Sequence, residues 1–283
     1  MNMLDYPQRI AIELTPLCNL SCAMCPRHHI TDTTGFITEE LWFKLIDDIS
    51  RNSPDTVVLP FWRGESLLHP QFLRLLEYAL SKSIRIHVST NGLLIDEKFA
   101  DLLCRCEFVN ISIHTVSGLK QAQSFSKLLK YKATKKPDVQ ISFVTGENTV
   151  RYLDDVILSR NLQGFDSVRL YKQHTINGDF GGIGTSLDVP RTYCAKLLDT
   201  LVIAYDGAIS RCSHIWTPEQ GPDLNQMSIQ EAWESQVMEK IRKDYPDPYC
   251  AGCDQWMGRT LGESWRMEDG MVEQEKIWPS NEI

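Results

Sequence analysis

Short apolar runs that favour strands alternate with helical segments between residues 9 and 174, and this alternation limits the fold more than any other feature. Six runs are predicted as strands: Arg9–Leu14, Thr56–Phe61, Ile84–Ser89, Phe108–His114, Val139–Val144 and Ser167–Tyr171. The segments between them are predicted as helices: Thr38–Ile49, Pro70–Ser81, Asp96–Cys104, Gly118–Tyr131 and Val150–Ser159. Such alternation implies an α/β fold with a parallel sheet and right-handed crossovers. Because there are six strands rather than eight, we expect an open, partial (β/α)6 TIM-like barrel.

Three cysteines, Cys18, Cys22 and Cys25, follow the first predicted strand at C-x-x-x-C-x-x-C spacing. They lie at a carboxyl strand end, where functional residues collect in such folds. Thiolates so spaced on one loop can bind three irons of a 4Fe–4S cluster and leave the fourth iron without a protein ligand. A zinc knuckle or buried free thiols are the alternatives. Zinc sites usually show paired cysteine units that supply four ligands, so the triplet favours iron–sulfur.

This cysteine loop resembles that of the radical S-adenosylmethionine (SAM) superfamily. The resemblance implies that the open iron binds SAM. It also implies that one electron cleaves SAM to methionine and a 5′-deoxyadenosyl radical, which abstracts a hydrogen atom from the substrate. In the family the residue before the third cysteine is often an aromatic that packs on the adenine. Here it is Met24, whose thioether can also pack on a ring face.

The segment Phe61-Trp62-Arg63-Gly64-Glu65-Ser66 follows the second predicted strand and resembles the family's G-G-E-P motif. The resemblance implies that Gly64 and Glu65 hold the SAM ammonium, since a carboxylate pairs with a cation and a glycine admits close approach. Two residues depart from the motif, because Arg63 replaces the first glycine and Ser66 the proline. An ordinary turn is the alternative interpretation.

Two later strands carry further residues that the resemblance assigns to SAM. Ser89, Thr90 and Asn91 precede Gly92 and resemble the family's S/T-T-N-G element, although Asn-Gly is also a common turn dipeptide. Ser112, in the fourth predicted strand, matches a family position whose hydroxyl reaches SAM.

Two other strand residues, His114 and Arg169, are candidates for the base that accepts the substrate's proton. A structural role is the alternative for His114. Cys104 and Cys106 are too close together to bind a cluster alone, and small core side chains are the preferred interpretation over a hydrogen-donor thiol.

A second cysteine set comprises Cys194, Cys212, Cys250 and Cys253. Between the first two, the segment 201–211 centres on Asp-Gly and predicts a β-hairpin. The segment Ser228–Lys243 predicts a helix, and a C-x-x-C pair follows it. Four thiolates make a closed metal site, and their spacing alone does not separate zinc from iron–sulfur.

The arrangement of this second set resembles the twitch domain, a shortened (half-SPASM) domain with one auxiliary 4Fe–4S cluster. The predicted parts are the radical SAM barrel (1–176), a glycine-rich linker (177–190), the twitch domain (191–255) and a tryptophan-rich tail packing on the barrel (256–283). Cysteine layout and length are similar to twitch-domain dehydrogenases that oxidise a secondary alcohol of a cyclitol.

Composition limits the partners. The chain is 42% hydrophobic with no apolar run long enough to span a bilayer, so no membrane partner is expected. Its net charge of −8 opposes a nucleic-acid partner. The N-terminus shows no secretory signal, so a cytoplasmic location is expected. The basic run from Lys127 to Lys136 is interpreted as a solvated helix end, with docking of an electron donor as the alternative.

These features and the resemblance predict a radical SAM oxidoreductase with two 4Fe–4S clusters and SAM as cofactors. The expected reaction removes a hydrogen atom from the carbinol carbon of a small polar substrate, and the second cluster accepts an electron. The implied partners are a small-molecule substrate and a low-potential donor such as flavodoxin or ferredoxin. Two alternatives stay open: a radical SAM epimerase or peptide-modifying maturase, and a non-enzymatic four-cysteine zinc-binding module.

Overall fold

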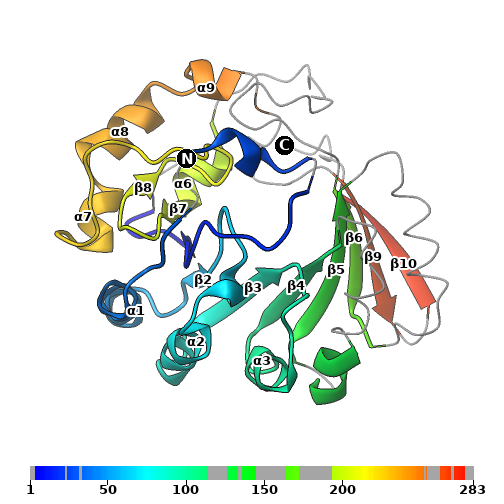
Figure 1. The fold of residues 1–283 in the computed structure, drawn as a ribbon. Coiled ribbons are helices and arrows are strands. Elements are labelled where there is room, and N and C mark those ends of the chain that lie inside the picture. Colours follow the sequence, from blue (N-terminus) through cyan, green and yellow to red (C-terminus); the bar gives the residue numbers. More distant parts are fainter. Residues whose placement is uncertain are drawn as a thin grey trace. The chain divides into compact units, whose positions relative to one another are not determined.

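The chain forms two compact units, each assembled from two stretches that are distant in sequence (Figure 1). The first unit comprises Met1–Ile86 with His174–Gly258, and the second comprises His87–Gln173 with Arg259–Ile283. The computed structural model describes residues 4–22, 24–31, 34–113, 126–132, 136–144, 164–171, 193–251, 253, 262–268 and 271–277. No helix within these ranges is long and apolar enough to cross a membrane.

The strands of the first unit place residues from both ends of the chain next to each other. They are β1 (Arg9–Ile12), β2 (Val57–Leu59), β7 (Thr200–Ile203), β8 (Ile209–Ser210) and the start of β3 (Arg85–Thr90). β1 lies between β2 and β7 and is parallel to both, while β8 is antiparallel to β7. The β7–β8 hairpin is the predicted one, and Gly207 in its turn has a φ of +94°. The pairing of β7 with β1 makes the hairpin an extension of the sheet that carries the first cysteine loop.

The helices of the first unit differ in whether a capping side chain starts them. They are α1 (Glu39–Asn52), α2 (Phe72–Ser81), α6 (Ala195–Asp199), α7 (Ile229–Trp233), α8 (Gln236–Lys243) and α9 (Pro248–Ala251), with short 3-10 turns at Pro26–His29 and Ser66–Leu68. Thr38 precedes two glutamates, which predicts an N-cap, and its hydroxyl accepts from the Leu41 amide. The prediction of one helix over Ser228–Lys243 is wrong. Ser228, at the predicted start, caps α7, but Ser235 accepts from the Met238 amide and starts a separate helix.

The second unit holds the remaining strands in the order β3-β4-β5-β6-β9-β10 (Figure 1). They are β4 (Phe108–Ser112), β5 (Asp138–Val144), β6 (Ser167–Tyr171), β9 (Gly262–Glu268) and β10 (Met271–Ile277), with helix α3 (Glu97–Leu103). β3 to β6 are parallel, whereas β9 runs antiparallel to β6 and forms a hairpin with β10. Part of the predicted tail is therefore a pair of strands, which its sequence did not indicate.

All six predicted strands are present within two residues of their predicted ends, and the parallel sheet is confirmed. The short apolar runs predicted these strands because strand side chains such as Ile10, Ile86, Val109 and Ile141 are buried in the core. The predicted helix 150–159, the glycine-rich linker, most of the predicted helix 118–131 and His114 lie outside the described residues.

Candidate functional site

The first cysteine loop leaves β1 and brings three thiols close together. The Cys25 amide donates to the Cys22 carbonyl at 2.9 Å, which closes the turn between them. Burial raises the pKa of Cys22 to about 11, with smaller contributions from Cys25 and Cys18. Burial likewise raises the pKa of Cys18 and of Cys25. Three half-buried thiols that influence one another form a donor set that fits a cluster with one iron left open.

Backbone contacts hold this loop in place. Leu17 donates its amide to the Thr15 hydroxyl at 3.1 Å, and that hydroxyl donates to the Gly35 carbonyl at 2.6 Å. The Arg27 guanidinium donates to the Pro16 carbonyl at 2.9 Å. The Arg27–Pro16 bond connects the two ends of the loop, and the Thr15–Gly35 bond attaches it to the chain that follows. The positions of the three thiols therefore depend on the fold around the loop.

The motif after β2 lies directly against the cysteine loop. A Cβ added at Gly64 would lie 2.2 Å from the Thr15 carbonyl oxygen and 2.4 Å from that of Leu17, so only glycine fits. The next amide, of Glu65, donates to the Leu17 carbonyl at 2.7 Å. Glu65 is 3% exposed and its charge contributes to the raised pKa of Cys18. A buried carboxylate thus lies beside the first cysteine, where it can pair with a ligand's ammonium.

The two departures from the motif both make hydrogen bonds. Ser66 donates its hydroxyl to the Pro60 carbonyl. Arg63 forms a buried, bidentate ion pair with Glu13, with Nε–Oε1 and Nη2–Oε2 distances of 2.8 and 2.6 Å. Glu13 was not among the predicted site residues. The sequence could have indicated Glu13, because it is a single carboxylate among the apolar residues of a predicted strand. A charge is rare at such a position unless it is paired.

A row of hydrogen-bonded polar side chains crosses β3, β4 and β5 in the second unit. The Asn110 amide donates to the hydroxyls of Ser89 and Ser112 at 2.9 and 3.1 Å. Ser112 lies 3.2 Å from the Ser142 hydroxyl, and Gln140 donates to the Asn110 carbonyl oxygen at 3.0 Å. The sequence analysis missed Asn110, Gln140 and Ser142. The sequence could have indicated them, because polar and apolar residues alternate in these buried strands. Successive side chains of a strand point to opposite faces, so the polar ones share a face.

The other predicted residues of the second unit divide into two groups. Thr90 and Asn91 accept from the amides of Gly92 and Leu93, both at 3.0 Å, which are turn contacts. Arg169 pairs in register with Ser142, so it continues the polar row onto β6, and its guanidinium lies 4.7 Å from the Tyr171 ring centroid.

Cys104 and Cys106 lie away from both cysteine sets in sequence and bond to the backbone of their own unit. The Cys104 thiol is 3.6 Å from the Leu128 carbonyl oxygen. Cys106 is fully buried, and burial raises its pKa to about 12. The Cys106 thiol lies 4.0 Å from the Leu102 carbonyl oxygen, so Cys106 is a core side chain, whereas Cys104 is half-buried.

The second cysteine set also comes together. Burial raises the pKa of Cys194 to about 11, and Cys212 and Cys253 add to the shift. For Cys250 the pKa rises to about 12, again chiefly through burial, with contributions from Asp247, Cys194 and Cys212. Each of the four thiols therefore lies within electrostatic reach of at least one other, and Cys194 of all three, which fits a four-thiolate site.

Arg211 connects the two halves of this second set. It is 8% exposed and forms ion pairs with Glu219 and Asp247. Asp247 in turn accepts from the Cys250 amide at 3.0 Å. The loop that carries Cys212 is thereby tied to the helix that carries Cys250, by residues that no spacing rule identified.

Within the described ranges, no three His, Cys, Asp or Glu side chains are arranged to hold a single metal ion. The thiols that hold a 4Fe–4S cluster can lie farther apart than the ligands of a single metal ion, because each thiolate binds a different iron.

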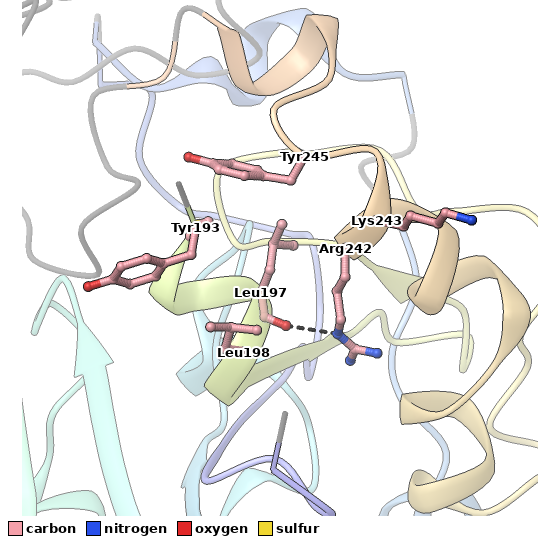
Figure 2. A pocket seen from close by; sticks show the side chains of 7 residues that line it. Tyr193, Leu197, Leu198, Arg242, Lys243 and Tyr245 are labelled. Carbon is pink, nitrogen blue, oxygen red and sulfur yellow. Dashed lines mark hydrogen bonds between the residues drawn. The ribbon is translucent and has the colours of Figure 1, made fainter. Parts of the chain in front are cut away.

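A pocket of about 410 Å³ lies beside Cys194 (Figure 2). Arg242 in its wall donates to the carbonyls of Leu197 and Trp233 at 3.0 and 2.8 Å, and its guanidinium lies 4.0 Å from the Trp233 ring centroid. Burial lowers the pKa of Arg242 to about 10. Figure 2 shows Lys243 directed away from the other labelled side chains. The half-buried guanidinium of Arg242 on α8 thus connects α8 to α6, which follows Cys194, and to α7.

Comparisons with known proteins agree with the two cysteine sets. The chain matches the Radical SAM superfamily over residues 12–140 and SPASM, an iron–sulfur cluster-binding domain, over residues 194–254. Among curated proteins it is 26% identical over 164 residues to the tungsten-containing aldehyde ferredoxin oxidoreductase cofactor-modifying protein of Pyrococcus furiosus, covering 51% of this chain and 46% of that protein. It is 26% identical over 163 residues to the mycofactocin maturase MftC of Mycobacterium ulcerans, covering 54% and 44%. The chain therefore matches less than half the length of these relatives.

Solved structures share the fold. BtrN in complex with AdoMet and 2-DOIA superposes with a TM-score of 0.60 at 16% identity, covering 91% of this chain and 93% of BtrN. Streptococcus suis SuiB bound to S-adenosylmethionine superposes with a TM-score of 0.66 at 14% identity, covering 92% and 74%.

Proposed function

The chain is a SPASM-domain member of the radical SAM superfamily, and on this premise we propose that it oxidises a secondary alcohol of a small polar substrate. Its cofactors are 4Fe–4S clusters and SAM. When bound, SAM and its cluster supply the 5′-deoxyadenosyl radical that abstracts hydrogen. The observation that carries the proposal is the convergence of Cys194, Cys212, Cys250 and Cys253, whose thiols contribute to one another's raised pKa, and we infer that all four bind one cluster. Four thiols leave no vacant iron for substrate, so the role that remains is to accept an electron.

The residues divide into three roles. Cys18, Cys22 and Cys25 hold the cluster that binds SAM, and Glu65 pairs with the SAM ammonium through the close approach that Gly64 permits. Met24 packs on the adenine. Ser89 and Ser112, with Thr90 and Asn91, contact SAM from the ends of β3 and β4. Cys194, Cys212, Cys250 and Cys253 hold the second cluster.

The substrate alcohol must lose a hydrogen atom, a proton and an electron to become a ketone. The overall balance is alcohol plus SAM giving ketone, methionine, 5′-deoxyadenosine and one proton. We assign proton acceptance to His114. A guanidinium has hydrogen-bond donors and no acceptor, so the part of Arg169 is to donate a hydrogen bond to the substrate from the polar row on β4 to β6.

Structural likeness supports a small-molecule substrate, since BtrN, whose structure covers 91% of this chain, was solved in complex with AdoMet and 2-DOIA. A second candidate, a peptide-modifying maturase, is favoured by the mycofactocin maturase among the curated relatives. The epimerase alternative needs a hydrogen-donor thiol, whereas Cys106 is fully buried and the Cys104 thiol bonds to the Leu128 carbonyl.

We further propose a low-potential flavodoxin or ferredoxin as the electron donor and the cytoplasm as the location. Thiols that must bind iron stay reduced there, and this chain carries nine cysteines.

Incubation with alcohols deuterated at the carbinol carbon tests the proposal. The reconstituted protein, SAM and a reductant should yield 5′-deoxyadenosine that carries one deuterium, together with a ketone. The Cys18→Ala variant is the negative control. Deuterium transfer from a labelled peptide, with none from cyclitols or sugars, would replace the dehydrogenase with a maturase.

A further inference from the structure

We propose that Trp62–Glu65, called here the bridging segment, sets the position of the first cysteine loop relative to the second cysteine set. The buried pair Glu13–Arg63 is its anchor. In this view Arg63 and Trp62 are positioning residues, and the replacement of the motif's first glycine by arginine has a function. The inference rests on the proposed function only for its last readout below.

The bridging segment bonds to the backbone beside one cysteine of each set. At one end, the Glu65 amide donates to the carbonyl of Leu17 at 2.7 Å, and Leu17 is the residue before Cys18. At the other end, the Trp62 indole donates to the carbonyl of Ser213 at 3.1 Å, and Ser213 is the residue after Cys212. Four consecutive residues thus span the distance between the two sets.

Arg63 extends this connection through its side chain. Besides its two bonds to Glu13, its Nη1 donates to the Trp216 carbonyl at 3.3 Å. Glu13 Oε2 also accepts from the Tyr205 amide at 3.4 Å. The pair therefore joins the end of β1, the bridging segment and the hairpin region of the second set. The Trp62 ring lies 4.4 Å from the guanidinium carbon and covers it.

Burial of this pair argues for a positional role. The side chains of Arg63 and Glu13 are 1% and 0% exposed. Removing two charges from water costs about as much free energy as their attraction returns, so such a pair is weak evidence for added stability. The planar guanidinium meets a carboxylate at two fixed points, which defines orientation in a way that a lysine does not.

Trp62→Phe tests the proposal because it removes the indole N–H and keeps an aromatic ring. Amide hydrogen exchange is measured on metal-free protein at the amides of 15–22 and 205–216. We expect both stretches to exchange about fivefold faster, the factor for one lost hydrogen bond.

Trp42→Phe is the matched control. The Trp42 indole donates to the Leu75 carbonyl at 2.8 Å in the same unit and joins α1 to α2. It should leave the two loops unchanged and speed exchange around α1 and α2. Equal changes in both variants, or a change at only one cysteine loop in Trp62→Phe, would overturn the proposal.

Arg63→Lys supplies a second test should Trp62→Phe fold poorly. The lysine keeps the charge but loses the two-point contact with Glu13, so the amides of both loops should again exchange faster. Unchanged exchange would contradict the role of the Glu13–Arg63 pair as anchor. In the reconstituted protein with both clusters reduced, the magnetic interaction between clusters should weaken in Trp62→Phe and stay unchanged in Trp42→Phe.

The last readout is the ratio of 5′-deoxyadenosine to ketone, which should rise at least threefold in Trp62→Phe. If no alcohol is oxidised by any variant, the proposed function fails. The exchange data still show whether the bridging segment positions the first cysteine loop relative to the second cysteine set.

Discussion

Single side chains decide whether this chain can perform its chemistry. The thiols of the two cysteine sets are held by different bonds, the first by a tight turn after β1 and the second by the Arg211–Asp247 ion pair. Because the sets are separate, their loss should have separate consequences.

We predict that Cys18→Ala abolishes formation of 5′-deoxyadenosine, because the cluster that binds SAM loses one of its three ligands. Cys250→Ala should retain SAM cleavage and lose ketone formation. Chromatography of both products from dithionite-reduced protein measures the difference. Cys104→Ala removes a half-buried thiol outside both sets and should retain both activities. A trapped substrate radical in that variant would instead support an epimerase.

Protonation of His69 gives a prediction about pH. His69 is 3% exposed, its Nε2 lies 3.0 Å from the Ile37 carbonyl oxygen, and its Nδ1 accepts from the Gln71 amide at 3.1 Å. The neutral ring satisfies both contacts. Burial lowers its pKa below the ordinary value, despite opposing contributions from Ile37 and Glu39.

Because the folded pKa is lowered, the unfolded chain binds the proton more readily. Stability from this site should be complete above about pH 6.5 and decline as the pH falls toward the folded pKa. Urea midpoints at pH 7.5 and 5.5 measure the loss. His69→Gln removes the titration, so its midpoint should change less between the two values. Equal pH dependence in both proteins would contradict the assignment.

Among the helices, strands and loops, the most constrained contact joins the motif after β2 to the cysteine loop after β1. Gly64 makes this contact possible because its Cα hydrogen faces two carbonyl oxygens. A methyl group there would force the two loops apart.

Gly64→Ala should therefore weaken SAM binding at least tenfold, with iron bound at both sets. Equilibrium dialysis of SAM against reconstituted protein measures the affinity. Gly221→Ala is the control, because it strains a turn at φ +124° but brings its Cβ only to 3.4 Å from Val237. It should lower stability and keep SAM affinity. Equal affinity in wild type and Gly64→Ala would disprove the close-approach argument.

The chain in its entirety is predicted to hold two clusters. Anaerobic reconstitution should yield about eight irons per chain, since each 4Fe–4S cluster contributes four. The triple variant Cys18→Ala, Cys22→Ala, Cys25→Ala should retain about four, and so should the variant lacking all four cysteines of the second set. Iron and sulfide analysis measures both. Zinc without the brown absorbance of iron–sulfur clusters would point to the non-enzymatic zinc module.

Local patterns identified much of this fold. Thr38 and Ser228 begin helices because their hydroxyls cap nearby amides, and Asp206-Gly207 forms a hairpin because glycine accepts a positive φ. The break at Ser235 was not predicted, because helical periodicity continues across it. The ion pairs Glu13–Arg63 and Arg211–Asp247 join residues that are far apart in sequence, where no spacing rule applies.

By itself, the sequence determined the six parallel strands, the two cysteine sets and the motif beside the first set. Each of these is encoded by residues close together in the chain, through apolar burial, capping or ligand spacing. Only the tertiary structure decided that β7 pairs with β1, that β9 pairs with β6, and that Arg63 faces Glu13. Strand pairing and buried ion pairs depend on which distant segments share a face, and the free energy of those contacts exists only once the chain has folded.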